Sequence, residues 1–395
     1  MRDKSTGLAD MYSPLYKRIE KDLRDRVQGG RWPAGTMLPS RKSLAKEYGV
    51  DMRTIQRAIG DLLADGTLHA HGGRGTFVAS SANGGHPGSS LGYGAPAKTV
   101  AIIAEQSFSP GPSWPVTIQA IHETLRREIS DCRLITLNTY DKTPEGVMRH
   151  ERDAVAVAEQ QHLAGVIMFH SGGDETIPDI RRVVDRGTPM VFIDRLPGDL
   201  KCDFVGIDNR YAACDGVEYL ISIGHRKIAF LAPEEEASTI EGRMAGYLEA
   251  LAKHKIEVNE EYICRVPLTK SFALDALRSE IGRIASQLMS REDRPTAIFV
   301  VNDFLAQHFV NSVEELGGTV PESISVLGFD DVEQFSARPG FLTSVRQPFE
   351  AIGERSAMLL LNRLHDNDGA PVFQHILLPT KLVVRQSTQA LSPAA

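Results

Sequence analysis

The first eighty residues alternate short apolar stripes with glycine and proline breaks, and the stripes have helical spacing. After Pro14, which can open a helix, an apolar residue recurs at every fourth position as far as Gly29-Gly30. The residues of this stripe are Leu15, Ile19, Leu23 and Val27. The spacing predicts a first helix that ends at the glycine pair.

Two further short helices are predicted on either side of Gly49, followed by a hairpin. Ser40 is a good N-cap for the second helix, and Gly49 ends it. The third helix runs from about Asp51 to Asp65. Its inward-facing residues are Ile55, Ala58, Ile59, Leu62 and Leu63. Two short strands are predicted at about 67–70 and 75–78, on either side of a glycine-rich tip.

From residue 98 onwards, short runs of branched and aromatic residues alternate with helical patterns. Strands are predicted at 99–105, 133–138, 165–170, 190–194, 204–208, 227–232, 296–301 and 324–329. Helical patterns between them cover 116–129, 145–162, 211–223, 241–254 and 303–316. Alternation of this kind predicts an α/β fold with parallel sheets that helices cover on both faces.

Between these regions, residues 80–97 (SSANGGHPGSSLGYGAPA) are rich in Gly and Ser and do not form a helical pattern. We therefore expect a first domain at 12–79, a flexible linker at 80–97 and a second domain at 98–390. Because such a linker is flexible, it cannot carry a signal as a rigid rod. It can limit how far apart the two heads of a dimer lie.

Charge is divided unevenly between the two domains. Residues 1–80 hold 14 Lys and Arg against 9 Asp and Glu, which gives about +5. The remaining residues hold 30 against 42, which gives about −12. A basic first domain on an acidic body favours a head that binds nucleic acid.

The absence of certain patterns disfavours several classes of protein. The four cysteines are scattered without a C-x-x-C pair, so we expect neither disulfides nor a zinc site, in keeping with a reducing cytosol. We see no signal peptide and no apolar run of about 18 residues, so we expect a cytoplasmic protein without membrane contact. No G-x-S-x-G, P-loop or H-E-x-x-H motif is present, so we expect no catalytic residues, cofactor or metal.

Two short helices around Gly49, with polar and basic residues early in the second, form a helix-turn-helix pattern. The second of these helices would present Arg53, Gln56 and Arg57 to the major groove. There Arg can bind guanine and Gln can bind adenine. Arg74 on the narrow hairpin would form a wing that enters a minor groove or follows phosphates. A solvated helix face is the alternative for Arg53 and Arg57.

These residues resemble the GntR family of winged-helix regulators. The matching residues are Pro14-Leu15-Tyr16, Pro33-Ala34-Gly35, Leu38-Pro39-Ser40-Arg41, Gly49-Val50, Thr54, Ala58, Leu62, Gly66 and Gly73-Arg74-Gly75-Thr76-Phe77-Val78. The resemblance implies that Arg41, the start of the third helix and the wing at Gly73-Arg74 contact DNA. Thr54 can cap the helix or contact phosphate.

The chain departs from the GntR pattern at the start of the third helix. The family usually has Ser-Arg after Gly-Val, where this chain has Asp51-Met52, and Gln56 stands where an arginine is common. Because Met52 cannot make the usual charged contact, we expect an operator different from the family's common one.

Polar or aromatic residues follow five of the predicted strands in the second domain. They are Gln106-Ser107-Phe108, His170, Asp194-Arg195, Asn302-Asp303 and Asp330-Asp331. The carboxyl ends of parallel strands meet at one edge of a sheet, where ligands bind. Five such ends in one domain favour a shared cleft, although a helix cap or loop role is the alternative for each taken alone.

Longer stretches of the second domain resemble the effector-binding domain of the LacI/GalR repressors. The matching segments, in order, are 208–232, 241–251, 295–307, 320–331 and 342–348. The resemblance implies two α/β subdomains, similar to periplasmic sugar-binding proteins, joined by three crossover segments. We place these near 207, 347 and 375, within 206–208, 345–348 and 371–380.

By this resemblance, the pocket residues are Asp194, Arg243, Asn302 and Asp330, with Gln347 near the hinge. The set suits a sugar, because carboxylates and amides bind hydroxyls in pairs and Arg donates in a fork. Candidate aromatic faces for the sugar ring, each with core packing as its alternative, are Phe108, Trp114 and Phe272. The resemblance places His225 in a turn before a strand, where its role is structural.

The whole chain resembles the arabinose-repressor type of hybrid regulator, with a GntR-like head on a LacI-like body. This implies a homodimer on double-stranded operator DNA, controlled by a small-molecule effector such as a sugar. A nucleoside or phosphorylated effector, and activation in place of repression, are the open alternatives. An exported sugar receptor would need a signal peptide and no DNA-binding head, and a constitutive nucleoid protein would not need the polar cluster.

Overall fold

The computed structural model describes residues 15–29, 31–32, 36–64, 67–71, 75–78, 98–105, 114–129, 132–141, 143–161, 163–171, 173–235, 237–267, 273–332, 338–365 and 372–391. The chain divides into two compact units, Met1–Ala97 (unit 1) and Lys98–Ala395 (unit 2), which we describe separately. The predicted linker at 80–97 lies outside the described residues.

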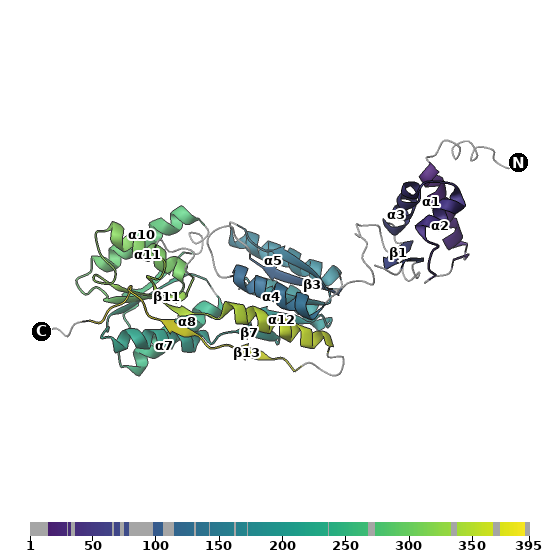
Figure 1. Ribbon diagram of the computed structural model, residues 1–395. Coiled ribbons are helices and arrows are strands. Elements are labelled where there is room, and N and C mark those ends of the chain that lie inside the picture. The colour runs from purple at the N-terminus through teal and green to yellow at the C-terminus, as the bar shows by residue number, and fades with distance from the viewer. Residues whose placement is uncertain are drawn as a thin grey trace. The chain divides into compact units, whose positions relative to one another are not determined.

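The described residues of unit 1 form three helices and a two-stranded antiparallel hairpin (Figure 1). These elements are α1 (Leu15–Gln28), α2 (Arg41–Tyr48), α3 (Met52–Ala64), β1 (Leu68–His71) and β2 (Gly75–Val78). Its core is made by Ile19, Leu23, Leu38, Leu44, Ala45, Ile55, Ala58, Ile59, Leu62, Leu68 and Val78. The apolar stripes in the sequence therefore meet in one small core.

The turn between α2 and α3 has the local geometry that its sequence predicts. The Ser40 hydroxyl accepts a hydrogen bond from the backbone N–H of Ser43 and caps α2. Gly49 ends α2 with φ of 65°, in the left-handed region that glycine adopts without steric cost. This turn sets the direction in which α3 leaves.

The N-terminal subdomain of unit 2 is built around a six-stranded parallel sheet in the order β13-β7-β6-β5-β3-β4. The strands are β3 (Lys98–Ala104), β4 (Cys132–Asn138), β5 (Gly165–Phe169), β6 (Met190–Ile193), β7 (Asp203–Gly206) and β13 (His375–Leu377). The helices are α4 (Trp114–Glu128), α5 (Pro144–Gln160), η1 (Asp174–Thr176), α6 (Ile177–Asp185) and α12 (Phe349–His365).

The C-terminal subdomain repeats this plan with the sheet order β14-β12-β11-β10-β8-β9. The strands are β8 (Ile228–Pro233), β9 (Ile263–Val266), β10 (Ala297–Val300), β11 (Ser325–Asp330), β12 (Thr343–Arg346) and β14 (Lys381–Val383). The helices are α7 (Asn209–Ser222), α8 (Ser238–Lys253), η2 (Glu260–Tyr262), α10 (Leu274–Met289) and α11 (Asp303–Glu315). The described strands pair in parallel except β14, which runs antiparallel to β12.

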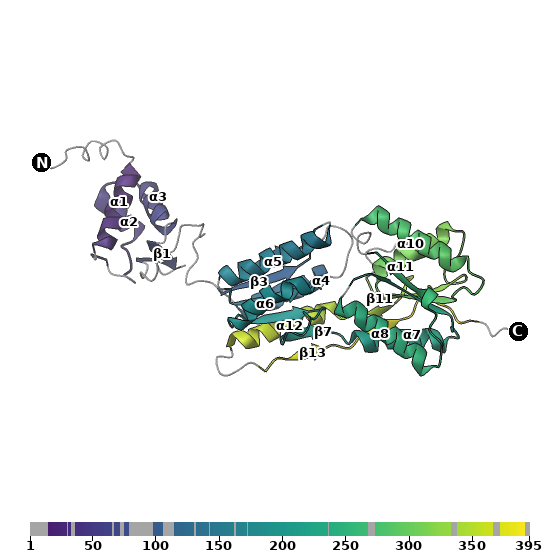
Figure 2. The same cartoon turned by 180° about the vertical axis from the view of Figure 1, so that it is seen from behind.

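Helices cover both faces of each sheet, so central strands such as β5 and β10 are buried on both sides (Figures 1 and 2). One apolar cluster lies between the N-terminal sheet and α5 and α6, and includes Val155 and Phe192. A larger cluster runs from the opposite face of that sheet into the C-terminal subdomain, and includes both Ile121 and Phe230. The two subdomains thus share a continuous core.

The chain passes between the subdomains three times. It leaves the N-terminal sheet after β7 and enters α7, and it returns from β12 into α12, which packs against α4. It crosses again between β13 and β14. These passages cover residues 207–208, 347–348 and 378–380.

The predicted fold class is confirmed: a small helical unit with a β-hairpin precedes two α/β subdomains. None of the helices in the described part of the chain is long and apolar enough to span a membrane.

Candidate functional site

The start of α3 in unit 1 is fixed by a side-chain cap. The Asp51 carboxylate accepts hydrogen bonds from both the backbone N–H and the hydroxyl of Thr54, at 2.7 and 3.0 Å. The backbone and side-chain hydrogen bonds from Thr54 lower the pKa of Asp51. The Thr54 hydroxyl therefore serves the helix cap in this structure.

The other predicted DNA-contacting residues on α2 and α3 have exposed side chains. They are Arg41, Arg53, Gln56 and Arg57. The Arg57 guanidinium stacks on the ring of Tyr16 in α1, 4.1 Å from its centroid. Met52, at the departure from the GntR pattern, is 56% exposed. Gly73 and Arg74 of the wing lie outside the described residues.

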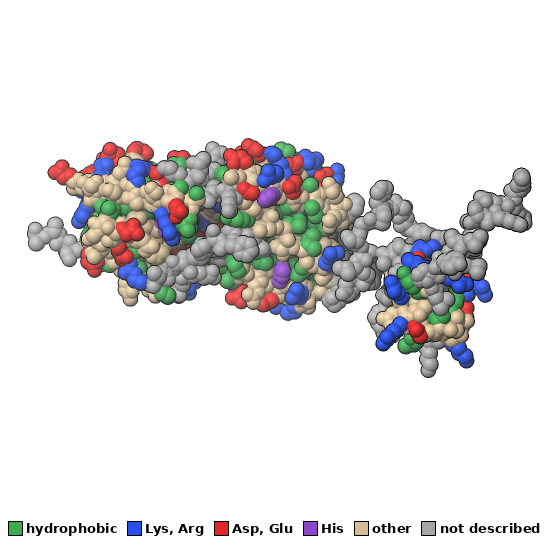
Figure 3. All heavy atoms as spheres, turned by 90° about the horizontal axis from the view of Figure 1, so that it is seen from above, with side chains coloured by type: hydrophobic (Ala, Val, Ile, Leu, Met, Phe, Trp, Pro, Cys, Tyr) green, Lys and Arg blue, Asp and Glu red, His purple; other side chains and the backbone are tan. Residues whose placement is uncertain are grey.

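The space-filling view adds the charge pattern to this picture. On the face shown in Figure 3, Lys and Arg side chains stand out on unit 1, whereas Asp and Glu side chains are frequent on unit 2. The exposed cations of α2 and α3 thus belong to a unit with net positive charge. Such a surface attracts a polyanion over a long range at low salt.

In unit 2, a cavity of about 150 Å³ is lined by residues of both subdomains. Seven of the predicted effector residues line it: Asp194, Arg195, Arg243, Asn302, Asp303, Asp330 and Gln347. They come from the ends of β6, β10 and β11, from α8 and from the second crossover. Residues far apart in the sequence are therefore brought together around one space.

Arg243 is the most buried of the cationic groups in this cavity. It is 6% exposed, and its guanidinium lies 3.8 Å from the centroid of the Phe329 ring. Its Nε donates to Asn209 Oδ1 at 2.9 Å, and Nη1 donates to the carbonyl of Val301. Burial lowers the pKa of Arg243, although the Asp330 carboxylate, 3.6 Å from Nη2, opposes this shift. The arginine is held rigidly.

Gly246 allows α8, the helix that carries Arg243, to pack closely against α7. A Cβ at Gly246 would lie 2.2 Å from the carbonyl oxygen of Arg210, so only glycine permits this approach. The close packing places Arg243 beside Asn209, the first residue of α7 after the first crossover. The glycine in the motif EGRMAG thus positions the arginine.

Two buried aspartates form the acidic wall of the cavity. Asp303 accepts hydrogen bonds from the Ser344 hydroxyl and the Val332 amide, both at 2.7 Å. Burial, together with the Asp330 carboxylate, raises the pKa of Asp303 well above its ordinary value. Burial also raises the pKa of Asp330 to about 6, against the opposing effects of Arg243 and Gln347.

Gln347 joins the cavity to the second crossover. Its Nε2 donates to Asp330 Oδ1 at 2.8 Å. Its Oε1 is buried and has no hydrogen-bond partner among the described residues. An orphaned acceptor that lines a cavity is satisfied when a ligand or water donates to it.

The N-terminal wall is formed by Asp194 and Arg195 after β6. Burial raises the pKa of Asp194, and Arg195 and Arg243 offset this only in part. Burial disfavours the Arg195 cation, but Glu235 and Asp194 outweigh it and raise the pKa of Arg195. Arg195 Nη1 donates to the Ser171 carbonyl at 2.8 Å and also to the Glu235 carboxylate.

The backbone is strained at the strand ends that carry these carboxylates. Asp194, Asp330 and Asp331 have φ values of 67°, 108° and 59°. Residues other than glycine rarely adopt positive φ, and such strain collects at ligand sites. The surrounding structure therefore holds these aspartates in imposed positions.

His170, predicted as an effector residue, is not among the described residues that line the cavity. Its side chain is buried, with Nδ1 3.1 Å from Glu151 Oε1. Burial alone would raise the pKa of Glu151, but contacts with His170, Thr176 and Ser171 lower it. His170 thus belongs to a buried cluster behind the cavity wall.

The aromatic candidates Phe108 and Phe272, and the side chain of Trp114, lie outside the described residues. His225, which we expected to be structural, is buried and within hydrogen-bonding distance of the Thr296 hydroxyl and the Gln389 carbonyl.

Several residues that line the cavity were absent from the sequence prediction. They are Pro233, Glu235, Thr239, Ile240, Val301, Phe304, Val332 and Phe349. Glu235 is the second residue after β8, as Arg195 is the second residue after β6. Its position after a strand end is the sequence signal that points to it.

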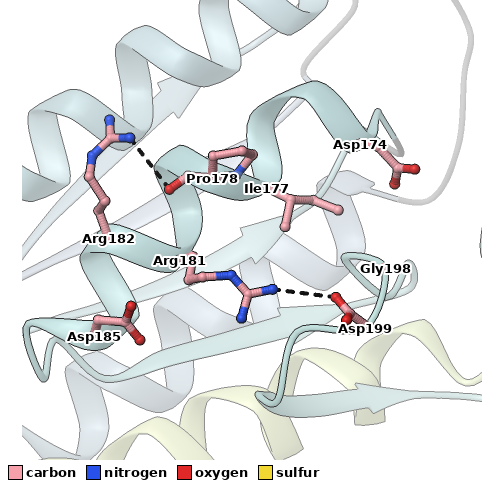
Figure 4. A pocket seen from close by; sticks show the side chains of 8 residues that line it. All are labelled: Asp174, Ile177, Pro178, Arg181, Arg182, Asp185, Gly198 and Asp199. Carbon is pink, nitrogen blue, oxygen red and sulfur yellow. Dashed lines mark hydrogen bonds and ion pairs between the residues drawn. The ribbon is translucent and has the colours of Figure 1, made fainter.

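A larger open depression of about 700 Å³ lies on the surface around α6 (Figure 4). Both arginines that line it are already paired, since Arg181 binds Asp199 at 3.3 Å and Arg182 binds Asp179. This surface contains no orphaned buried polar atom of the kind seen at Gln347 among its described residues. The smaller and more enclosed cavity is therefore the candidate ligand site.

The described residues contain no group of three or more His, Cys, Asp or Glu side chains that could hold a metal ion.

Comparison with known proteins agrees with this division. Residues 15–78 match the bacterial regulatory proteins of the gntR family, and residues 217–388 match the periplasmic binding protein-like domain. The chain is 24% identical over 383 residues to the arabinose metabolism transcriptional repressor of Geobacillus stearothermophilus, across 96% of this chain and 98% of that protein. The chain joins a GntR-type head to a periplasmic binding protein-like body and is a transcriptional regulator. The two resemblances found in the sequence are thereby confirmed.

Further relatives of the regulator are also repressors. It is 29% identical over 297 residues to the HTH-type transcriptional repressor PurR of Photobacterium profundum, across 75% of this chain and 82% of that protein. Unit 2 shares its fold with a LacI family transcriptional regulator from Enterococcus faecium, solved with bound ribose. That likeness has a TM-score of 0.60 and 23% identity, and covers 75% of this chain and all of the other.

Proposed function

We propose that the regulator is a repressor that binds operator DNA as a homodimer and releases it when a small neutral sugar binds in the cavity of unit 2. The observation that carries the proposal is the convergence of polar groups from both subdomains on one enclosed space. The unsatisfied Oε1 of Gln347 in that space supports a ligand that donates hydrogen bonds.

The charges in the cavity favour a neutral effector. Its lining carries Asp194, Glu235, Asp303 and Asp330 against Arg195 and Arg243. Both arginines are already engaged by carboxylates or carbonyls. A phosphorylated sugar would place more negative charge beside these carboxylates, whereas neutral hydroxyls can donate to them.

The size of the cavity also favours a single sugar ring over the nucleoside alternative. At about 150 Å³ it is smaller than the roughly 300–1,000 Å³ of pockets that hold drug-sized ligands. The relative named for arabinose metabolism, and the fold relative with bound ribose, are consistent with a pentose. L-Arabinose and D-ribose are therefore the first compounds to test.

Direct contacts between the cavity and two of the crossovers support a coupling mechanism. Arg243 bonds to Asn209 at the end of the first crossover, and Asp330 bonds to Gln347 in the second. An effector that binds these side chains would act on the segments about which the subdomains turn. The heads of the dimer would then lose the spacing that the two half-sites require.

For operator recognition we propose the exposed residues Arg41, Arg53, Gln56 and Arg57, with Thr54 and the wing residues Gly73 and Arg74. The start of α3 would lie in the major groove. Arg53 is exposed next to the capped first turn of α3, which is the position from which such helices read bases. Arg57 contributes less, because its guanidinium is stacked on Tyr16.

A thermal-shift screen of the full chain tests the effector class. L-arabinose, D-ribose and D-xylose would be compared with D-ribose 5-phosphate and with adenosine. We expect a neutral pentose to raise the melting temperature and the phosphate to have no effect. Stabilisation by the phosphate or the nucleoside alone would contradict the proposed class.

Coupling is tested by titrating the effector with and without operator DNA selected from genomic fragments. By thermodynamic linkage, operator must weaken effector binding by the factor by which effector weakens operator binding. Equal effector affinity in both titrations would reject the release mechanism, and tighter binding with operator would favour activation. Sedimentation of the complex determines whether two chains bind one operator.

A further inference from the structure

Two contacts join the subdomains at the wall of the cavity. Arg195, which follows β6, donates from Nη1 to the Glu235 carboxylate, which follows β8. The backbone N–H of Leu196 donates to the Ser238 hydroxyl at the start of α8, at 3.0 Å. β6 and β8 belong to different sheets, so both contacts link one subdomain to the other.

On the N-terminal side, the Arg195 guanidinium is held from behind. Nη1 also donates to the Ser171 carbonyl at 2.8 Å. The Ser171 amide in turn donates to Glu151 Oε2 at 2.6 Å, and Glu151 is fully buried. Because this side is anchored, closing or opening the cavity changes the distance between Arg195 and Glu235.

Glu235 competes with a second carboxylate for Arg195. Asp194 Oδ2 lies 3.8 Å from Arg195 Nε, within the same subdomain. If Glu235 loses its charge, the arginine keeps its contacts with Ser171 and Asp194 but loses its link to the other subdomain. The side chains of Arg195 and Glu235 are each 24% exposed, so their attraction is only partly screened by solvent.

We infer that Glu235 is a positioning residue that holds the cavity closed through Arg195 and thereby sets the affinity for the effector. The inference rests on the proposed function in placing the effector in this cavity. A ligand clamped by both subdomains binds with an apparent Kd equal to its intrinsic Kd divided by the closed fraction. A lower closed fraction therefore weakens binding by the same factor.

The exchange rate of the Leu196 amide reports whether the cavity is closed, even without a ligand, because its acceptor Ser238 lies on the other subdomain. Hydrogen–deuterium exchange of the peptide covering 194–200 would be measured in the full-length chain and in E235Q, with E234Q as the matched control. Glu234 is exposed and does not line the cavity. We expect E235Q to speed exchange of this amide by about two- to fivefold, E234Q to leave it unchanged and E235D to restore it in part.

Calorimetric titration with L-arabinose and D-ribose separates closure from direct contact. If Glu235 acts through closure, E235Q speeds exchange of the Leu196 amide and also weakens binding of the sugar, because both changes follow from a lower closed fraction. Weaker binding with unchanged exchange would mean that Glu235 contacts the ligand directly, which overturns the inference. If neither sugar binds the wild-type chain, the proposed effector class fails, while the exchange measurement still decides the role of Glu235.

A second variant, S238A, tests the same link between the subdomains in case E235Q misfolds. S238A removes the acceptor of the Leu196 amide and leaves the ion pair in place. We expect S238A to speed exchange at Leu196 and also to weaken sugar binding. Wild-type exchange at Leu196 in both E235Q and S238A would show that these contacts do not hold the cavity closed.

Discussion

The arginines of unit 1 and those of the cavity in unit 2 differ in what surrounds them. Arg41, Arg53 and Arg57 are exposed on short helices over a small core. Arg195 and Arg243 are enclosed, and each has protein partners fixed before any ligand arrives. The first arrangement gives salt-dependent attraction to a polyanion, and the second gives a rigid frame for a small ligand. Substitution of an exposed arginine in unit 1 should therefore weaken DNA binding without changing stability. Substitution of an enclosed arginine in unit 2 should weaken both effector binding and stability.

The largest effect is expected for Arg243→Met. The variant leaves Asn209 Oδ1, the Val301 carbonyl and the Asp330 carboxylate without their buried donor. We expect loss of effector binding and a free energy of unfolding lower by about 3–5 kcal/mol, measured by calorimetric titration and urea denaturation.

Arg210→Met on α7 is the control for Arg243→Met, because Arg210 is an exposed arginine paired with Glu249. It should stay close to wild type in both measurements. If Arg243→Met were equally harmless, the distinction between enclosed and exposed arginines would not hold.

A smaller effect, confined to binding, is expected for Arg53→Ala. Loss of one bidentate base contact is worth about 1–3 kcal/mol, so operator affinity should fall by about 5- to 150-fold in fluorescence anisotropy. The melting temperature should not change, because the side chain is exposed.

Arg18→Ala, which removes an exposed cation from α1, is the control for Arg53→Ala. An equal loss of affinity in both variants would indicate general charge attraction in place of base recognition. Comparing the salt dependence of both variants would sharpen this distinction.

The pH dependence of effector binding should distinguish the cavity from the head. Asp330, which faces Arg243, Gln347 and Asp194, has a pKa raised to about 6, so it gains a proton as the pH falls through that value. A protonated Asp330 accepts hydroxyl donors poorly, so effector affinity should be about tenfold weaker at pH 5 than at pH 7. Isothermal titration at both pH values measures this change.

The raised pKa of Asp330 also makes the stability of the folded chain depend on pH. Because the folded chain holds the Asp330 proton to a higher pH than the unfolded chain does, the contribution of this group to stability falls as the pH rises from about 4 to about 6. D330N should bind the effector weakly and lose this pH dependence. Persistence of the full pH dependence in D330N would assign it to another group.

The smallest effect is expected for Arg57→Ala. The cation–π contact with Tyr16 is worth about 0.5–1 kcal/mol at an exposed site, so the free energy of unfolding should fall by that amount. Operator affinity should change by less than it does in Arg53→Ala. An equal or larger loss of affinity would mean that Arg57 leaves Tyr16 to contact DNA.

Parts of the fold were predictable because burial on both faces leaves a plain signal. Runs such as that of β5 are apolar throughout, and polar residues begin where the sheet ends. The same property explains why the sequence does not show which way the His170 side chain points. A strand buried on both faces has no alternation to show which way the next side chain turns, and His170 meets Glu151 behind the cavity wall.

Other parts of the site depend on relations that a single sequence does not contain. The ion pair of Arg195 and Glu235 joins residues 40 positions apart on different subdomains. That Gln347 Oε1 has no hydrogen-bond partner among the described residues becomes visible only when the surrounding atoms are in place. Residue types at strand ends thus predict where a cavity lies. The contacts that close it, and the polar atoms left without a partner, are seen only in the three-dimensional structure.

The continuous apolar cluster of unit 2 also has a calorimetric consequence. Because this cluster spans both subdomains, they should melt together, whereas the separate core of unit 1 can melt on its own. A heating scan of the full chain should then show two heat-absorption peaks of unequal size. A sugar bound in the cavity should move only the larger peak to higher temperature.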